Sequence, residues 1–114
     1  MTTLAHIIDA MMVSDSPADI GSLGRVAFWH AELGRLDIQS ITEDDVEDAC
    51  IRLAKRGKLT AGRNMTAKPS GKPLAPATIT RYLTTLAGIY RWAKRQRLLP
   101  RRLEIPTKGL EKPT

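Results

Sequence analysis

The chain has little of several features that mark particular classes of protein. It contains one cysteine in 114 residues, and aromatic residues make up only 4% of it. A single cysteine cannot form a disulfide within the chain, which is typical of a reducing compartment, so we expect a cytoplasmic protein. No apolar run approaches the roughly 20 residues that a membrane-spanning helix needs. The first residues also lack the basic segment and cleavage pattern of a secretory signal, so we expect no membrane partner.

Groups of side chains that bind metal ions or perform catalysis are also scarce. The densest acidic cluster comprises Glu43, Asp44, Asp45, Glu47 and Asp48. These carboxylates fall at the start of a predicted helix, where negative charge interacts favourably with the helix dipole. No histidine or cysteine stands at metal-ligand spacing beside them. We therefore predict no metal ion, no cofactor and no catalytic residue in this chain.

Acidic residues are missing from a long part of the chain, and this divides the sequence into two parts of opposite charge. Residues 1–50 contain two basic and ten acidic side chains, a net charge of −8. The remaining 64 residues contain sixteen basic and two acidic side chains, a net charge of +14. A basic part of this kind favours a polyanionic partner, and nucleic acid is the polyanion we expect. The alternative is a basic surface that only keeps the protein in solution.

Four segments combine apolar residues three and four positions apart with a signal that starts a helix. The signals are a threonine cap, a Ser-Pro pair, a Thr-Asp capping pair and a proline at the first helical position. In chain order they are Thr2 or Thr3, Ser16 with Pro17, Thr42 with Asp45, and Pro76. Gly34 and Gly57 are predicted to end the second and third helices. The predicted core positions, helix by helix, are Leu4, Ile7, Ile8, Met11 and Met12; Ile20, Leu23, Ala27 and Leu33; Val46, Ala49, Cys50 and Leu53; and Ile79, Leu83, Leu86, Tyr90 and Ala93, with Tyr82 and Ile89 widening the last stripe.

We predict an all-α fold, a small orthogonal four-helix bundle, because no stretch alternates apolar and polar residues as a strand does. Residues 57–75 are rich in glycine, proline, lysine and threonine, which predicts a long basic loop before the last helix. We expect residues 60–73 and the tail after about Thr107 to be poorly ordered.

The last predicted helix, residues 75–99, has two chemically different sides. One side carries the apolar positions and should face the core. The opposite side is short or cationic and contains no carboxylate, whereas a helix that only faces solvent normally mixes its charges. We therefore expect this side to bind an anionic partner. It consists of Ala77, Arg81, Thr84, Thr85, Gly88, Arg91, Lys94 and Arg95.

The same helix resembles a known protein family. Residues 76–86 read PATITRYLTTL, and residues 89–93 read IYRWA. This pattern is similar to the last helix of the core-binding domain of tyrosine recombinases, the phage-integrase family, in which roughly Ser-x-x-Thr-Ile-x-Arg-x-Leu-x-x-Leu precedes an aromatic residue and an alanine. Residues 34–41, followed by the acidic helix start at 42–46, likewise resemble the segment before the third helix of that domain.

The resemblance implies a core-binding domain at residues 1–106, with residues 107–114 as the start of a linker to a catalytic domain that is absent here. In that family the core-binding domain clamps duplex DNA, and a separate C-terminal domain holds the Arg, Lys, His, Arg and nucleophilic Tyr that cut and rejoin strands. Tyr82 and Tyr90 fall on the core side of the last helix and do not match that nucleophile. The chain is therefore expected to bind double-stranded DNA without catalysing a reaction. It is expected to be monomeric alone, to act with the catalytic domain of the same protein, and to belong to a parent that oligomerises on DNA.

The last helix also suggests which residues contact the DNA. Thr78 lies in its first turn, where free backbone N–H groups and the helix dipole favour phosphate. Arg81, one turn further on, is close enough to that end to reach a base edge or a phosphate, whereas the other cations suit backbone contacts. The predicted DNA-binding residues are Lys68, Lys72, Thr78, Arg81, Thr85, Arg91, Lys94 and Arg95.

Two alternatives remain open. A helix-turn-helix regulator joins its paired helices by three or four residues, and the long segment 57–75 before the last helix does not fit that spacing. A helical protein-interaction domain could instead use the methionine-containing face of the first helix as an adaptable groove.

Overall fold

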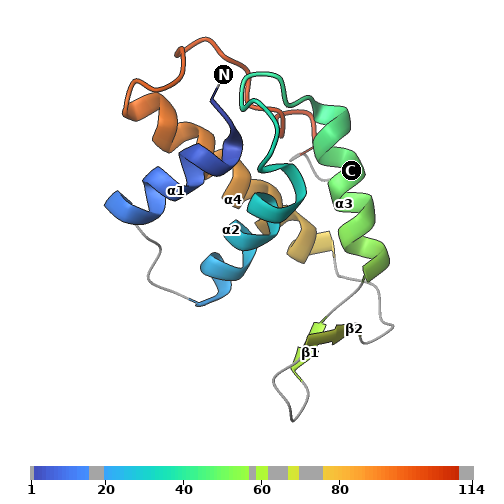
Figure 1. The fold of residues 1–114 in the computed structure, drawn as a ribbon. Helices are drawn as coiled ribbons and strands as arrows, with labels where there is room; N and C mark the ends of the chain where they lie inside the picture. The colour runs from blue at the N-terminus through green and yellow to red at the C-terminus, as the bar shows by residue number, and fades with distance from the viewer. Residues whose placement is uncertain (1, 16–19, 57–58, 62–66, 70–75, 111–114) are drawn as a thin grey trace.

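The computed structural model describes residues 2–15, 20–56, 59–61, 67–69 and 76–110, and within them the chain forms four helices and one short hairpin (Figure 1). The predicted all-α four-helix bundle is confirmed. α4 packs against both α1 and α2, and α2 also contacts α3. No helix in these ranges is long and apolar enough to cross a membrane. The elements are α1 (Leu4–Asp15), α2 (Ile20–Leu33), α3 (Glu43–Arg56), β1 (Leu59–Ala61), β2 (Ala67–Pro69) and α4 (Pro76–Arg95).

Three of the four predicted helix starts are found where the capping residues place them. The Thr3 hydroxyl accepts a hydrogen bond from the backbone N–H of His6 at 3.2 Å, as an N-cap does. Thr42 and Asp45 form the reciprocal capping box, with N–H to side-chain oxygen distances of 3.0 and 3.2 Å. Pro76 is the first residue of α4. The predicted Ser16–Pro17 start lies outside the described residues.

The segment between α2 and α3 completes the start of α1. The backbone N–H groups of Leu4 and Ala5 donate to the carbonyls of Leu36 and Gly34, each at 2.9 Å. First-turn N–H groups have no partner within their own helix, so these two bonds satisfy groups that would otherwise need water. Gly34 allows the end of α2 to lie close to the start of α1. A Cβ at position 34 would lie 2.1 Å from the His30 carbonyl oxygen and 3.2 Å from the Ala5 Cβ.

The core is built from all four helices and the segment between α2 and α3. Trp29 and Tyr90 are the largest fully buried side chains. On α2 the predicted core face was only partly right: Leu33 is buried as predicted, but Ala27 is exposed and Leu23 is half-buried. Val26, Phe28 and Trp29 are buried instead. Burial of the larger apolar surface of the aromatic rings explains which face turns inward. The buried core residues that the helical periodicity did not predict are Val26, Phe28, Trp29, Ile38, Ile41, Ala87, Trp92 and Leu99.

The last helix ends at Arg95, before the predicted end at residue 99. Leu98 donates its N–H to the Ala93 carbonyl at 2.9 Å, and Arg97 donates to the Lys94 carbonyl at 3.0 Å. Arg97 has φ 60°, the left-handed conformation. This pair of bonds around a left-handed residue is the Schellman motif, which glycine usually makes. Because arginine occupies that position here, no glycine marks the end of the helix in the sequence.

Residues 57–75 contain two short strands that the sequence did not predict. β1 and β2 pair antiparallel, with Leu59 opposite Pro69 and Ala61 opposite Ala67. Figure 1 shows this hairpin apart from the helices, beyond the end of α3. The rest of the stretch, and with it most of the predicted poorly ordered segment 60–73, lies outside the described residues. Three-residue strands are too short to show an alternating pattern, so composition alone predicted a loop.

The chain after α4 folds back onto the bundle. Thr107 is fully buried, although we expected poor order from about this residue onwards. The Gly109 N–H donates to Glu43 Oε1 on α3 at 3.2 Å. Leu103, Ile105 and Leu110 pack against the edge of the core. The packed structure therefore continues to at least Leu110, past residue 107, where we placed the start of a linker.

Candidate nucleic-acid interface

The side of α4 that faces away from the core carries one cation near its start and several from Arg91 onwards. Arg81, Arg91 and Arg95 are exposed, whereas Leu83, Leu86 and Tyr90 on the other side are buried. α4 contains no acidic residue. Thr78 lies half-buried in its first turn, as predicted. The three arginines therefore project from a helix whose opposite side anchors it in the core.

Thr85 has partners within the protein, which we did not predict. Its hydroxyl accepts a hydrogen bond from Arg25 Nε on α2 at 3.0 Å and donates to the Arg81 carbonyl at 2.9 Å. Arg25 also donates to the Ser22 hydroxyl at 3.0 Å. These bonds bring a half-buried arginine from α2 to the outward side of α4. Arg25 is 60 residues away in sequence, so the helical pattern of α4 gave no signal for it.

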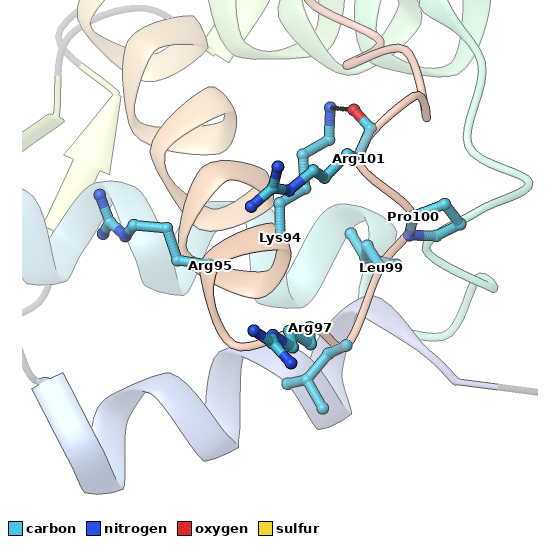
Figure 2. Close-up of a pocket in the computed structure, with 7 residues that line it drawn as sticks. Lys94, Arg95, Arg97, Leu99, Pro100 and Arg101 are labelled. Carbon is cyan, nitrogen blue, oxygen red and sulfur yellow. Dashed lines mark hydrogen bonds between the residues drawn. The ribbon is translucent and has the colours of Figure 1, made fainter.

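Lys94 is also engaged inside the protein. Its Nζ donates to the Arg101 carbonyl at 3.1 Å (Figure 2). It also donates to the Leu103 carbonyl. Lys94 is half-buried, and the two bonds tie the chain after α4 to the last turn of the helix. An ammonium group has three N–H donors, so one remains for another acceptor. Lys94 therefore has both a structural role and a cationic charge near the surface.

The cationic surface extends beyond α4 into the segment that follows it. An open hollow of about 820 Å³ lies between the last turn of α4 and this segment. Figure 2 shows side chains that line it. Four basic side chains line it together with Leu98, Leu99 and Pro100. We name this site the α4-end hollow. Its basic residues are Lys94, Arg95, Arg97 and Arg101.

A second, smaller hollow adjoins the first. It has a volume of about 370 Å³ and shares Lys94 with the α4-end hollow. Its lining contains four cations and one carboxylate, Glu104. We name it the Thr107 hollow, because the buried Thr107 is part of its wall. The lining residues are Arg91, Lys94, Arg102, Leu103, Glu104, Ile105, Thr107 and Lys108.

The two predicted contacts from the loop are not brought to this surface by the described residues. Lys68 lies in β2, where it pairs with Thr60 of β1. Lys72 lies outside the described residues. Arg97, Arg101 and Arg102 do border the surface, although we did not predict them as DNA contacts. The run of basic residues from position 91 to 102 was the signal that could have identified them.

Neither tyrosine of α4 stands among these cations. Tyr90 is fully buried and donates its hydroxyl to the Ile38 carbonyl at 2.8 Å. Burial, reinforced by the carboxylates of Asp37 and Asp45, raises the Tyr90 pKa well above its ordinary value. The ring of Tyr82 packs edge-on against Phe28 with centroids 5.2 Å apart. Both rings therefore help to hold α4 in the core.

The described part of the chain contains no group of three or more His, Cys, Asp or Glu side chains placed to hold a metal ion. Two of the acidic residues at the start of α3 already accept hydrogen bonds within the protein. Asp45 caps the helix with Thr42, and Glu43 accepts from Gly109.

Burial and the nearby Glu47 raise the pKa of the Cys50 thiol to about 11, so this thiol is protonated at neutral pH.

A scan of protein-family models and searches of curated proteins and of solved structures find no match to this chain. The arrangement of its own residues is therefore the basis for proposing a function.

Proposed function

We propose that this chain is a duplex-DNA-binding module whose contact surface is the outward side of α4 and the α4-end hollow. The observation that carries the proposal is the absence of any acidic residue between Asp48 and Glu104. Exposed cations in this interval include Arg81, Arg91 and Arg95, with Arg97, Arg101 and Arg102 after the helix. A surface that only keeps a protein soluble normally mixes positive and negative charges. A surface that binds the phosphate backbone of DNA instead favours cations without acidic residues.

The dimensions of α4 suit a DNA groove. Its 20 residues correspond to a length of about 30 Å at the usual rise of a helix. The major groove of B-DNA admits an α-helix. Arg81, near the N-terminal end, would then contact base edges or phosphates, and Arg91 and Arg95 would contact the backbone. Side chains in the core, such as Leu86, hold the helix so that these cations are presented together.

We further propose that the module is the core-binding domain of a site-specific tyrosine recombinase of the phage-integrase type. The resemblance in residues 76–93 supports this, because the arginine of the pattern, Arg81, is exposed while Leu83 and Leu86 are buried. The four-helix architecture has the order expected for that domain. Strand cleavage would then be performed by a separate catalytic domain, on DNA on which the parent protein oligomerises, in the cytoplasm.

The two alternatives fit the structure less well. Met11 is buried and Met12 is packed against the core, so the methionine face of α1 is largely occupied inside the protein. A helix-turn-helix would have to use α1 and α2, which four residues separate. Its second helix would present Arg25, whose guanidinium already binds Thr85 and Ser22.

Direct binding measurements test the proposed function. Fluorescence anisotropy with a labelled DNA duplex should show binding that weakens steeply as salt rises. The double variant Arg91→Ala/Arg95→Ala should bind more weakly to every duplex sequence. Arg35→Ala is the matched control, because residue 35 belongs to the segment that packs on the core side of α4 through Ile38 and Tyr90. Absence of duplex binding at low salt would refute the proposal and favour a protein-interaction domain.

A further inference from the structure

A third hollow lies between α1 and α2, apart from the cationic surface. Its volume is about 260 Å³, and none of its lining residues belongs to α4. A partner that enters it would therefore leave the cations of α4 free. We name it the α1–α2 groove. It is bordered by Ile8, Asp9 and Met12 of α1 and by Leu23, Ala27 and Ala31 of α2.

Apolar surface at the α1–α2 groove is open to solvent. Ala27 and Ala31 are exposed, and Met12 and Leu23 are only half-buried. Val13 follows Asp9 by one helical turn on the same side of α1. Its side chain is 89% exposed, the largest fraction among the exposed large apolar residues of the described chain. Continuous apolar surface of this kind marks a site where another molecule binds.

The charges beside the groove favour one kind of partner. The first 24 residues contain three aspartates, at positions 9, 15 and 19, and no lysine or arginine. Asp9 and Asp15 are exposed on α1. The one arginine of α2, Arg25, is half-buried and donates to Thr85 on α4. An apolar groove beside carboxylates is complementary to apolar side chains that are flanked by lysine or arginine.

Asp9 and His30 connect the two sides of the groove. Asp9 Oδ1 lies 3.1 Å from His30 Nε2, and the side chains of His30 and Asp9 are 43% and 72% exposed. A carboxylate has two oxygens and accepts several hydrogen bonds, so Asp9 can accept from a second donor while it keeps its contact with His30. A lysine or arginine of a partner would supply that donor.

We propose that the α1–α2 groove binds a basic amphipathic helix of a partner protein. A hollow between two packed helices accepts apolar side chains that recur every three or four residues, which is the helix-in-groove mode of recognition. Ala27 and Ala31 lie one turn apart and have short side chains, so a third helix can approach α2 closely. A partner in extended conformation would need a sheet edge, and neither described strand lines the groove.

A second copy of this chain is a less suitable occupant. Its strongly basic helix, α4, has its apolar side buried in its own core. Apart from Val13, the exposed large apolar residues of the described chain are Ile51 and Leu98. These two residues lie in different segments, so they do not form one face of a basic helix.

A designed peptide is the probe, and the measurement contains no DNA, so it does not depend on the proposed function. The peptide consists of alanine, leucine and lysine over about five helical turns, with the leucines on one face and lysines beside them. Fluorescence anisotropy should show that it binds the wild-type chain. Two control peptides should bind on the order of tenfold more weakly. One has the same composition with the leucines spread around the helix, and the other has glutamate in place of every lysine. Equal binding of all three, or no binding of the basic peptide, would overturn the proposal.

Variants in the groove test the site itself. Ala27→Arg places a long cation in the groove and should abolish binding of the basic peptide. Ala54→Arg is the matched control, because Ala54 is an exposed alanine of α3 and the change adds the same charge to a helix. Its affinity should equal that of wild type. Asp9→Asn should weaken binding by about two- to fivefold, the size of a surface charge effect. Equal losses in Ala27→Arg and Ala54→Arg would contradict the assignment, and the exposed position in Ala31→Arg repeats the test if Ala27→Arg does not fold.

Two measurements on the wild-type chain check the location and the occupant. In heteronuclear NMR spectra the backbone shifts caused by the basic peptide should be confined to α1 and α2, and shifts centred on other elements would refute the proposal. Sedimentation of the chain alone should show a monomer. Self-association that Ala27→Arg abolishes and Ala54→Arg preserves would assign the groove to a second copy, which would likewise refute it.

Discussion

Tyr90 on α4 donates its hydroxyl hydrogen bond to the backbone carbonyl of Ile38, 52 residues earlier in the chain, at 2.8 Å. The bond is buried, and it joins α4 to the segment between α2 and α3. Trp29 makes a comparable bond from its Nε1 to the Tyr82 carbonyl, also at 2.8 Å. Two aromatic side chains thus combine burial with one directed bond each, and together they fix the position of the helix that carries the cationic surface.

The first prediction concerns Tyr90. The Tyr90→Phe variant keeps the ring and leaves the Ile38 carbonyl without its buried donor, which should lower the free energy of unfolding by about 1–3 kcal/mol. Urea unfolding followed by circular dichroism measures this loss. Tyr82→Phe is the control, since the described structure shows no hydrogen bond from the Tyr82 hydroxyl, and its stability should be nearly unchanged. Equal stability of Tyr90→Phe and wild type would mean that the bond contributes nothing.

The second prediction concerns Arg97, which has φ 60°. That conformation costs an L-amino acid roughly 1–2 kcal/mol, and glycine adopts it freely. After the larger backbone entropy of glycine in the unfolded chain is subtracted, Arg97→Gly should raise the free energy of unfolding by about 0.5–1 kcal/mol. Arg95→Gly loses the same charge inside the last turn of α4 and should instead lower stability by up to about 1 kcal/mol. A fall in stability for Arg97→Gly would show that its left-handed conformation is not the dominant effect.

The third prediction concerns alkaline pH. Burial, and to a smaller extent Glu47, raises the pKa of Cys50 from 9.0 to about 11, so the folded chain keeps a proton that the unfolded chain releases. Stability linked to this proton is complete below pH 9.0 and is lost as the pH rises toward 11. The raised Tyr90 pKa adds a further loss above its ordinary value of 10.0. Urea midpoints measured from neutral to alkaline pH should therefore fall in this window, and less steeply for Cys50→Ala. A midpoint independent of pH would contradict this account.

Local signals in the sequence predicted much of the fold. The cap at Thr3, the pair Thr42 and Asp45 and the proline at position 76 act through neighbours in the chain, so their helix starts could be located correctly. The side of α4 that faces solvent followed from helical spacing in the same way. The end of α4 could not be located, because its left-handed residue is Arg97 rather than glycine.

Contacts between distant segments could not be predicted. The helical pattern of α2 predicted that Ala27 faces the core. In the structure Trp29 packs against α4 instead, so a different face of α2 is buried. The bond from Arg25 to Thr85 and the return of the chain to Glu43 on α3 likewise depend on the three-dimensional arrangement. The charge pattern therefore identified α4 as the candidate site. The two hollows beyond the end of α4 became apparent only in the structure.

The proposed contact between the outward side of α4 and duplex DNA can be tested by a salt series of dissociation constants. Removing one backbone contact by Arg91→Ala or Arg95→Ala should flatten the dependence of log K on log salt by about one unit and weaken all sequences alike. Arg81→Ala should cost about 1–3 kcal/mol if it contacts guanine, with part of the loss confined to the specific site. Arg35→Ala should leave both affinity and slope unchanged. If Arg35→Ala weakens binding as much as the α4 variants, or if no α4 variant changes the slope, α4 does not form the DNA-binding surface.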